Sequence, residues 1–77
     1  MMIVFNSRKF SEKVRMKRFI ELRLDLRSTA KLIDISAATL SRIENERMPD
    51  VITYAKVCDW LNCSTDEFIE FNKQSPV

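Results

Sequence analysis

Glycine and histidine are both absent from this chain of 77 residues, and cysteine occurs only twice. Without histidine there is no histidine metal ligand, no histidine general base, and no Ser-His or Cys-His nucleophile pair. Without glycine there is no glycine-rich loop to hold a phosphate group. Two cysteines, Cys58 and Cys63, cannot supply the four thiolates of a zinc site. These absences argue against an enzyme, and they predict no metal, no cofactor and no small-molecule substrate.

Long apolar runs are missing as well. No stretch of about 18 apolar residues could span a membrane, and the apolar start at residues 1–5 is shorter than the roughly 7 to 15 residues of a signal-peptide core. Hydrophobic residues make up 45% and charged residues 31% of the chain, which favours a folded domain over disorder. The expectation is one small cytoplasmic domain.

The net charge of +2 conceals an uneven distribution. Residues 1–47 carry eleven basic and six acidic side chains, a net +5, whereas residues 48–77 carry two basic and five acidic ones, a net −3. A basic half beside an acidic half indicates an anionic partner on one side. Ordinary solubilising charge explains the same numbers, so charge alone leaves both interpretations open.

Short polar residues take over the role of glycine at the helix boundaries and predict five helices. The first two are expected at residues 11–23 and 26–33, and the next two at 36–45 and 51–61. A short fifth helix is expected after Ser64, because the sequence Ser-Thr-Asp-Glu has the form of a capping box. The expected helix starts are Ser11, Asp25, Ser36 and Asp50, and the expected stops are Asp34 and Asn62.

Apolar spacing predicts which helix faces form the core. In the first helix the expected stripe is Met16, Phe19, Ile20 and Leu24. In the fifth helix the apolar residues are Phe68, Ile69 and Phe71. Residues 11–72 are expected to form the domain and residues 73–77 a frayed tail. Residues 1–10 are ambiguous between a strand, an interface segment and a loose arm.

One stretch of the sequence predicts a function. From Ala30 to Ile43 it alternates helix, a short turn and helix, with Ile35 in the turn and Leu40 facing inward. This is the apolar pattern of a helix-turn-helix, two helices that cross steeply over a short turn. The second helix of such a unit is presented outward, and an α-helix fits the major groove of duplex DNA.

The segment ISAATLSRIENER, residues 35–47, resembles the Xre group of bacterial and phage regulators, the lambda-repressor-like DNA-binding domains. The similarity extends through Pro49 and a following helix to the sequence STDEF. It implies an all-α, five-helix domain with a helix-turn-helix. The chain departs from the family pattern where Asp34, Glu46 and Asn62 replace the usual glycines and where Leu26 replaces a glutamine.

The resemblance also implies roles for individual residues. The candidates for contacts to DNA bases are Ala37, Ala38, Ser41 and Arg42. The candidates for contacts to phosphates are Arg27, Lys31, Ser36, Thr39 and Arg47. Glu44 is expected to pair with Arg18 in a structural role. For each surface residue the alternative is an ordinary solvated or helix-capping side chain. Cys58 and Cys63 are expected in the core, and an exposed Trp60 would indicate dimerisation.

The functional hypothesis is a sequence-specific transcriptional regulator, a repressor in particular, that binds double-stranded DNA as a homodimer on a pseudo-palindromic operator. The second helix of the motif, which begins near Ser36, would enter the major groove. The alternative is a protein-interaction module on the same fold, such as an antitoxin-like component. Glu46, the missing glutamine at Leu26 and the apolar residues 2–5 favour that alternative.

Overall fold

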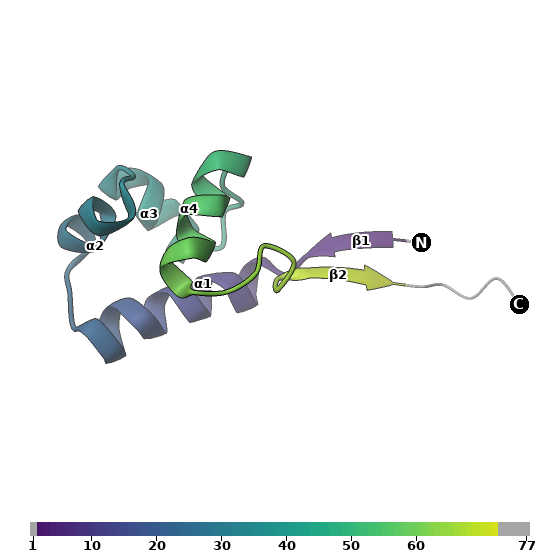
Figure 1. Cartoon of the computed structure of the whole chain (residues 1–77), viewed down its shortest axis with the longest axis horizontal. Helices are drawn as coiled ribbons and strands as arrows, with labels where there is room; N and C mark the ends of the chain where they lie inside the picture. Colours follow the sequence, from purple (N-terminus) through teal and green to yellow (C-terminus); the bar gives the residue numbers. More distant parts are fainter. Residues whose placement is uncertain (1, 73–77) are drawn as a thin grey trace, which may run out of the picture.

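The helices form a bundle from which a two-stranded ribbon projects (Figure 1). A computed structural model describes residues 2–72. Its elements are β1 (Met2–Phe5), α1 (Ser7–Arg15), η1 (Met16–Leu22), α2 (Leu26–Ile33), α3 (Ala37–Glu44), α4 (Val51–Leu61) and β2 (Ile69–Asn72). The segment η1 is a π-helix that continues α1. Strands β1 and β2 pair antiparallel, with Ile3 opposite Phe71 and Phe5 opposite Ile69.

Three of the predicted helix starts are confirmed. Each capping side chain accepts a hydrogen bond from the backbone amide three residues later, which satisfies one of the free donors of the first turn. The pairs are Asp25 with Ser28 at 2.8 Å, Ser36 with Thr39 at 3.0 Å, and Asp50 with Thr53 at 2.7 Å. Hydrogen bonds from Ser28 and Thr53 hold the pKa values of the two capping carboxyls below their ordinary range.

The helices end on left-handed residues although no glycine is available. The positive φ angles are 52° at Arg23, 68° at Asp34, 64° at Glu46 and 58° at Asn62. After α3, the amide of Glu46 donates to the carbonyl of Ile43 and the amide of Arg47 donates to that of Arg42, at 3.1 and 3.0 Å. This is the Schellman arrangement, which satisfies two free carbonyls of the last turn. The stops predicted at Asp34 and Asn62 are confirmed.

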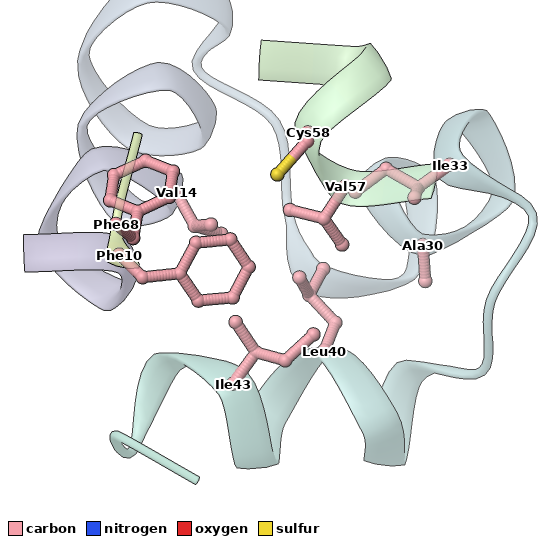
Figure 2. Close-up of a cluster of buried hydrophobic side chains, with 9 residues drawn as sticks. All are labelled: Phe10, Val14, Ala30, Ile33, Leu40, Ile43, Val57, Cys58 and Phe68. Atoms are coloured by element: carbon pink, nitrogen blue, oxygen red, sulfur yellow. The ribbon is translucent and has the colours of Figure 1, made fainter. Parts of the chain in front are cut away.

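The core lies among α1, α2, α3 and α4, with one side chain from the turn before β2. Its buried apolar members are Phe10, Val14, Ala30, Ile33, Leu40, Ile43, Val57, Cys58 and Phe68. Figure 2 shows Leu40 and Ile43 extending from α3 toward Phe10 and Val57. The inner face of α3 is therefore committed to packing, which leaves the opposite face to the surface.

The predicted core face of the first helix is wrong. The helix begins at Ser7 with Asn6 as its N-cap, and Ser11 is a buried helical residue instead of a cap. Met16, Phe19 and Ile20, expected inside, are 61%, 66% and 59% exposed.

Two cations explain why the inward face of this helix is not apolar along its whole length. After Phe10 and Val14, the positions that continue the face are Lys17 and Arg18, both half-buried. Lys17 donates a hydrogen bond to the carbonyl of Trp60, and its amino group lies 5.1 Å from the centre of the Trp60 ring. Arg18 donates to Glu44. The partners of these charges come from distant parts of the chain, so spacing along the helix does not show them.

The predicted fifth helix is also wrong. Residues 65–68 form turns and are followed by β2, and Ser64 bonds to the side chain of Asp66 instead of capping a helix. Phe68 is buried, as expected, but Phe71 is 54% exposed. The segment becomes a strand because β1 lies beside it. Of the three possibilities for residues 1–10, the structure therefore shows a strand at 2–5 and the start of α1. The tail at 73–77 lies outside the described residues.

The cysteines and the tryptophan are largely inside. Cys58 is buried, which raises the pKa of its thiol to about 11. Cys63 is half-buried and packs against the core. Trp60 is half-buried as well, so the exposed tryptophan that would have indicated dimerisation is not present.

Candidate nucleic-acid interface

Helices α2 and α3 are joined by the turn Asp34-Ile35-Ser36, which sets their crossing. Asp34 adopts the left-handed conformation that ends α2, and the amide of Ile35 donates to the carbonyl of Ala30 at 3.0 Å. The amino group of Lys56 on α4 donates to the backbone carbonyl and the carboxylate of Asp34, at 3.0 and 3.2 Å. The turn is thus tied to α4, and Lys56 offsets the charge of the aspartate that replaces glycine.

The outer face of α3 is small and uncharged apart from one arginine. Residues at the spacing three, four and seven lie on one helix face, and Ala38, Ser41, Arg42 and Asn45 follow this spacing. Arg42 and Ala38 are exposed, whereas Ser41 is half-buried. The amide side chain of Asn45 turns back and donates to the carbonyl of Ser41 at 2.8 Å. A helix with such a low surface can approach the floor of a groove closely, with the arginine as its longest side chain.

The structure does not bring all the expected base contacts together. Ala37 is half-buried and packs against the core, so it lies beside the outer stripe and not on it. Ser36 is occupied as a cap, since its hydroxyl also donates to the Thr39 hydroxyl at 2.7 Å. Thr39 accepts that bond and retains its own hydroxyl proton as a donor. Of the sequence candidates, Ala38, Ser41 and Arg42 share the outer face.

The remaining basic candidates lie on α2 and just after α3. Arg27 and Lys31 are exposed on α2, and Arg47 is exposed just after α3. A cleft of about 220 Å³ at the junction of α3 and α4 is lined in part by Thr39, Arg42 and Arg47. The N-terminus of α3, which is capped by the uncharged Ser36, adds partial positive charge. Cations on the segments before and after a groove-binding helix are suited to the phosphates that border the groove.

Arg18 and Glu44 are brought together beneath this surface. The guanidinium Nε and Nη2 atoms donate to the two carboxylate oxygens at 2.5 and 2.8 Å, and Nη1 donates to the carbonyl of Leu24 at 3.0 Å. The two side chains are only 14% and 10% exposed. The hydrogen bond to Glu44 raises the pKa of Arg18. This pair joins the last turn of α3 to η1 and to the loop that enters α2.

Sequence reasoning missed two residues of this region. Asn45, which is not among the sequence candidates for base contacts, is the C-cap of α3 and also falls on the outer stripe. Counting three residues on from Arg42 would have found it. Lys56 was not considered, because its contact with Asp34 joins α4 to the turn and has no signal in the local sequence.

Glu46 places a carboxylate next to the outer face of α3, on a residue with a left-handed backbone conformation. A Cβ atom in that conformation destabilises the folded protein by roughly 1 to 2 kcal/mol. Glycine removes this strain, but it also makes the unfolded chain more flexible, which cancels part of the gain in stability. Glu46→Gly is therefore expected to raise the free energy of unfolding by about 0.5 to 1 kcal/mol, measured by urea denaturation. Glu46→Ala removes the charge but keeps the Cβ, so an equal gain in that variant would contradict the backbone explanation.

A comparison with protein families identifies the unit. The geometry defines a helix-turn-helix protein, and the family model described as helix-turn-helix matches residues 15–68. The chain belongs to this family, whose domains are of the Xre type and lambda-repressor-like. No curated protein matches the chain.

Membership in the family establishes a DNA-binding, non-enzymatic domain. The expectation that the chain is not an enzyme is thereby confirmed. Within residues 2–72, no helix combines the length and the apolar character needed to cross a membrane. Across the same residues, no group of three or more acidic or cysteine side chains could hold a metal ion.

Proposed function

We propose that this protein is a sequence-specific transcriptional regulator that binds double-stranded DNA as a homodimer and acts as a repressor. The observation that supports it most directly is the outer face of α3, a low stripe on which Ala38 and Arg42 are exposed and Ser41 is half-buried. Base edges in the major groove are accessible to such a helix. A chain of 9.1 kDa offers few base contacts, so a dimer on a pseudo-palindromic operator supplies the specificity that one subunit lacks. A cytoplasmic location follows from this proposal.

Selection of bound duplexes from a random pool tests the proposal. The enriched sequences are expected to contain two related half-sites about 10 to 10.5 base pairs apart, or a multiple of this spacing, because each subunit presents one recognition helix. A pool that shows no enrichment over its input would contradict sequence-specific binding. A single unpaired motif would contradict the symmetric dimer while leaving the DNA-binding face intact. Repression itself is tested by placing the selected site in a reporter promoter.

Arg42 is the side chain expected to distinguish bases. Its guanidinium can donate to O6 and N7 of guanine together, which is worth roughly 1 to 3 kcal/mol of discrimination. Because a dimer carries two copies of Arg42, Arg42→Ala is expected to weaken binding to the selected duplex by at least about 30-fold, and to abolish the preference for guanine at one position of each half-site. Because the residue is exposed, the melting temperature should not change.

The matched control is Arg15→Ala, which removes another exposed arginine, on α1. Its affinity for the selected duplex is expected to stay within a factor of a few of the native value. Equal losses in both variants would show that Arg42 contributes general charge and not base recognition. If Arg42→Ala loses no affinity for the duplex, a surface other than the outer face of α3 binds DNA.

A protein partner is a second candidate function, on different evidence. Met16, Phe19 and Ile20 expose a contiguous apolar surface on η1, which we call the η1 surface. Exposed apolar patches of this kind mark protein interaction sites. This surface supports the interaction module, for which an antitoxin-like component is one example. A native chain that enriches no duplex from the random pool would favour this candidate.

A further inference from the structure

The ribbon formed by β1 and β2 has one face that is entirely apolar. Directly paired residues of an antiparallel ladder lie on the same face, and alternate positions share it. The pairs Ile3–Phe71 and Phe5–Ile69 therefore face one side. At the root of the ribbon, the Phe5 ring packs 5.5 Å from the rings of Phe10 and Tyr54. At its outer end, Ile3 and Phe71 are 64% and 54% exposed.

This face continues onto the start of α4. Ile3, Phe5 and Ile69 line one side of a groove of about 590 Å³, and Met48 and Val51 line the other. Met48 is 69% exposed and Val51 80%. The exposed residues Ile3, Phe71, Met48 and Val51, together with the groove, are called the ribbon surface below.

We propose that the ribbon surface is the interface through which two copies of this chain form the dimer. The proposal rests on the proposed function, because it locates the contact that a symmetric operator requires. An apolar side chain of this size exposes roughly 100 Å² when free, so the four exposed residues supply about 300 Å². A standard interface buries about 800 Å² on each partner, and its fully buried centre is its most apolar part. The four exposed side chains would therefore supply about a third of that area, at its apolar centre.

The absence of charge on the ribbon surface favours a second copy over a different partner. Residues near a two-fold axis meet their own symmetry mates, so any charge there would face an identical charge. The named residues that form this surface and its groove are all uncharged, and the exposed charges beside it, Arg47 and Asp50, have opposite signs. By contrast, the η1 surface is flanked by Arg15 and Arg23, whose doubling across an axis would be repulsive. The η1 surface is thus unsuited to self-association.

The position of the ribbon surface also suits two recognition helices on one operator. The centre of α3 is separated from Met48 by half of the helix, at 1.5 Å per residue, and by the four residues that follow Glu44, at no more than about 3.6 Å each. Met48 therefore lies within about 20 Å of the centre of α3. A two-fold axis beside Met48 therefore separates the two copies of α3 by no more than about 40 Å. Helices that bind successive major grooves are about 34 to 36 Å apart, which falls inside this limit.

A partner at this surface also explains how the ribbon is maintained. An isolated two-stranded ribbon is marginally stable at best in water. Phe5 and the hydrogen bond from the Asn6 amide to the carbonyl of Phe68, at 2.7 Å, fix the root, but Met2, Ile3 and Phe71 extend past the core with large exposed fractions. Burial against a second copy stabilises that outer part.

Two matched double variants test the proposal by sedimentation equilibrium of the full chain. The first, Ile3→Gln with Met48→Gln, changes the ribbon surface, and the second, Ile20→Gln with Met16→Gln, makes the same changes on the η1 surface. All four native side chains are 59% to 69% exposed, and none of the substitutions alters charge. The native chain and the second variant are expected to sediment as dimers of twice 9.1 kDa. The first variant should raise the dimer dissociation constant by at least about 30-fold.

Equal weakening by both variants, or a native chain that remains monomeric, would overturn the ribbon interface. Melting temperatures measured alongside distinguish lost association from lost folding. Binding of each variant to a duplex with a single half-site separates this proposal from the proposed function. If the ribbon variant is monomeric and still binds the half-site as the native subunit does, the ribbon inference is supported independently. If no form binds DNA but the dimer forms through the ribbon, only the proposed function fails.

Discussion

Raising the salt concentration from about 50 to 200 mM is expected to weaken binding to the selected duplex by roughly 10³-fold. Arg27, Lys31 and Arg47 are the exposed cations placed for phosphates, and two subunits make about six such contacts. Each phosphate that a cation neutralises releases condensed counterions. A plot of the logarithm of the binding constant against the logarithm of the salt concentration therefore has a slope near −0.9 per contact. For about six contacts the total slope is about −5. Fluorescence anisotropy titrations at several salt concentrations measure this slope.

Single substitutions determine which cations contribute. Lys31→Gln removes one contact from each subunit and should reduce the magnitude of the slope by about 2. Arg8 on α1 serves as the control, because its charge is exposed and already paired with Glu12 at 3.4 Å, and Arg8→Gln should leave the slope unchanged. A slope near zero in the native protein would contradict the phosphate contacts. Similar changes at Lys31 and Arg8 would mean that net charge matters and the position of the cation does not.

The helix-turn-helix could be predicted from sequence because its boundaries are local. Asp25, Ser36 and Asp50 each cap a helix through an amide three residues further on, so the relevant partners appear side by side in the sequence. The same holds for Asp34 and Asn62, whose left-handed conformations satisfy the turn just before them. These signals place α2, α3 and α4 without information from the rest of the chain.

The ribbon could not be predicted in this way. The segment Ile69–Asn72 is a strand only because Met2–Phe5, at the other end of the chain, supplies the hydrogen-bonding partners. Judged locally, Ser64 and Glu67 favour a helix start, and a competing partner distant in sequence overrides that preference. The role of residues 1–10 was ambiguous for the same reason.

The sequence predicts which helix carries the candidate site, but it does not predict which residues at the edge of that helix face outward. Spacing alone places Arg42 opposite Leu40 and Ile43, but it does not decide how residues at the edge of the apolar face are divided. The packing of α3 against its neighbours turns Ala37 toward the core and leaves Ala38 on the outer stripe. The contact between Arg18 and Glu44 followed from the family resemblance, since nothing in the spacing of either helix indicates it.

Removing Glu44 is expected to destabilise the protein more than any surface substitution. In Glu44→Ala, the Arg18 side chain, which is 14% exposed in the native protein, loses the carboxylate that balances its charge and keeps the Leu24 carbonyl as an acceptor. Leaving one member of a largely buried ion pair without its partner costs roughly 3 to 5 kcal/mol, most of it the lost compensation for desolvation. A value near the lower end, about 3 kcal/mol, is expected because the pair keeps some contact with solvent. Urea denaturation measures this loss.

A second ion pair in the same chain provides the comparison. Arg8 and Glu12 lie 3.4 Å apart with side chains 79% and 53% exposed, and exposed pairs of this spacing contribute only about 0.3 to 0.5 kcal/mol. Glu12→Ala should therefore change the free energy of unfolding by less than about 0.5 kcal/mol. Similar losses for Glu12→Ala and Glu44→Ala would mean that burial does not set the strength of the Arg18 pair.

Replacing both members of the buried pair distinguishes unpaired charge from lost packing. Apolar residues of similar volume often match or exceed a buried ion pair in stability, so Arg18→Met with Glu44→Leu is expected to recover most of the loss seen in Glu44→Ala. Because the pair links the last turn of α3 to η1, the double variant also tests its geometric role. If stability returns while duplex affinity stays low, the ion pair orients the recognition helix. If both stability and duplex affinity return, the ion pair stabilises the fold and has no separate role in DNA binding.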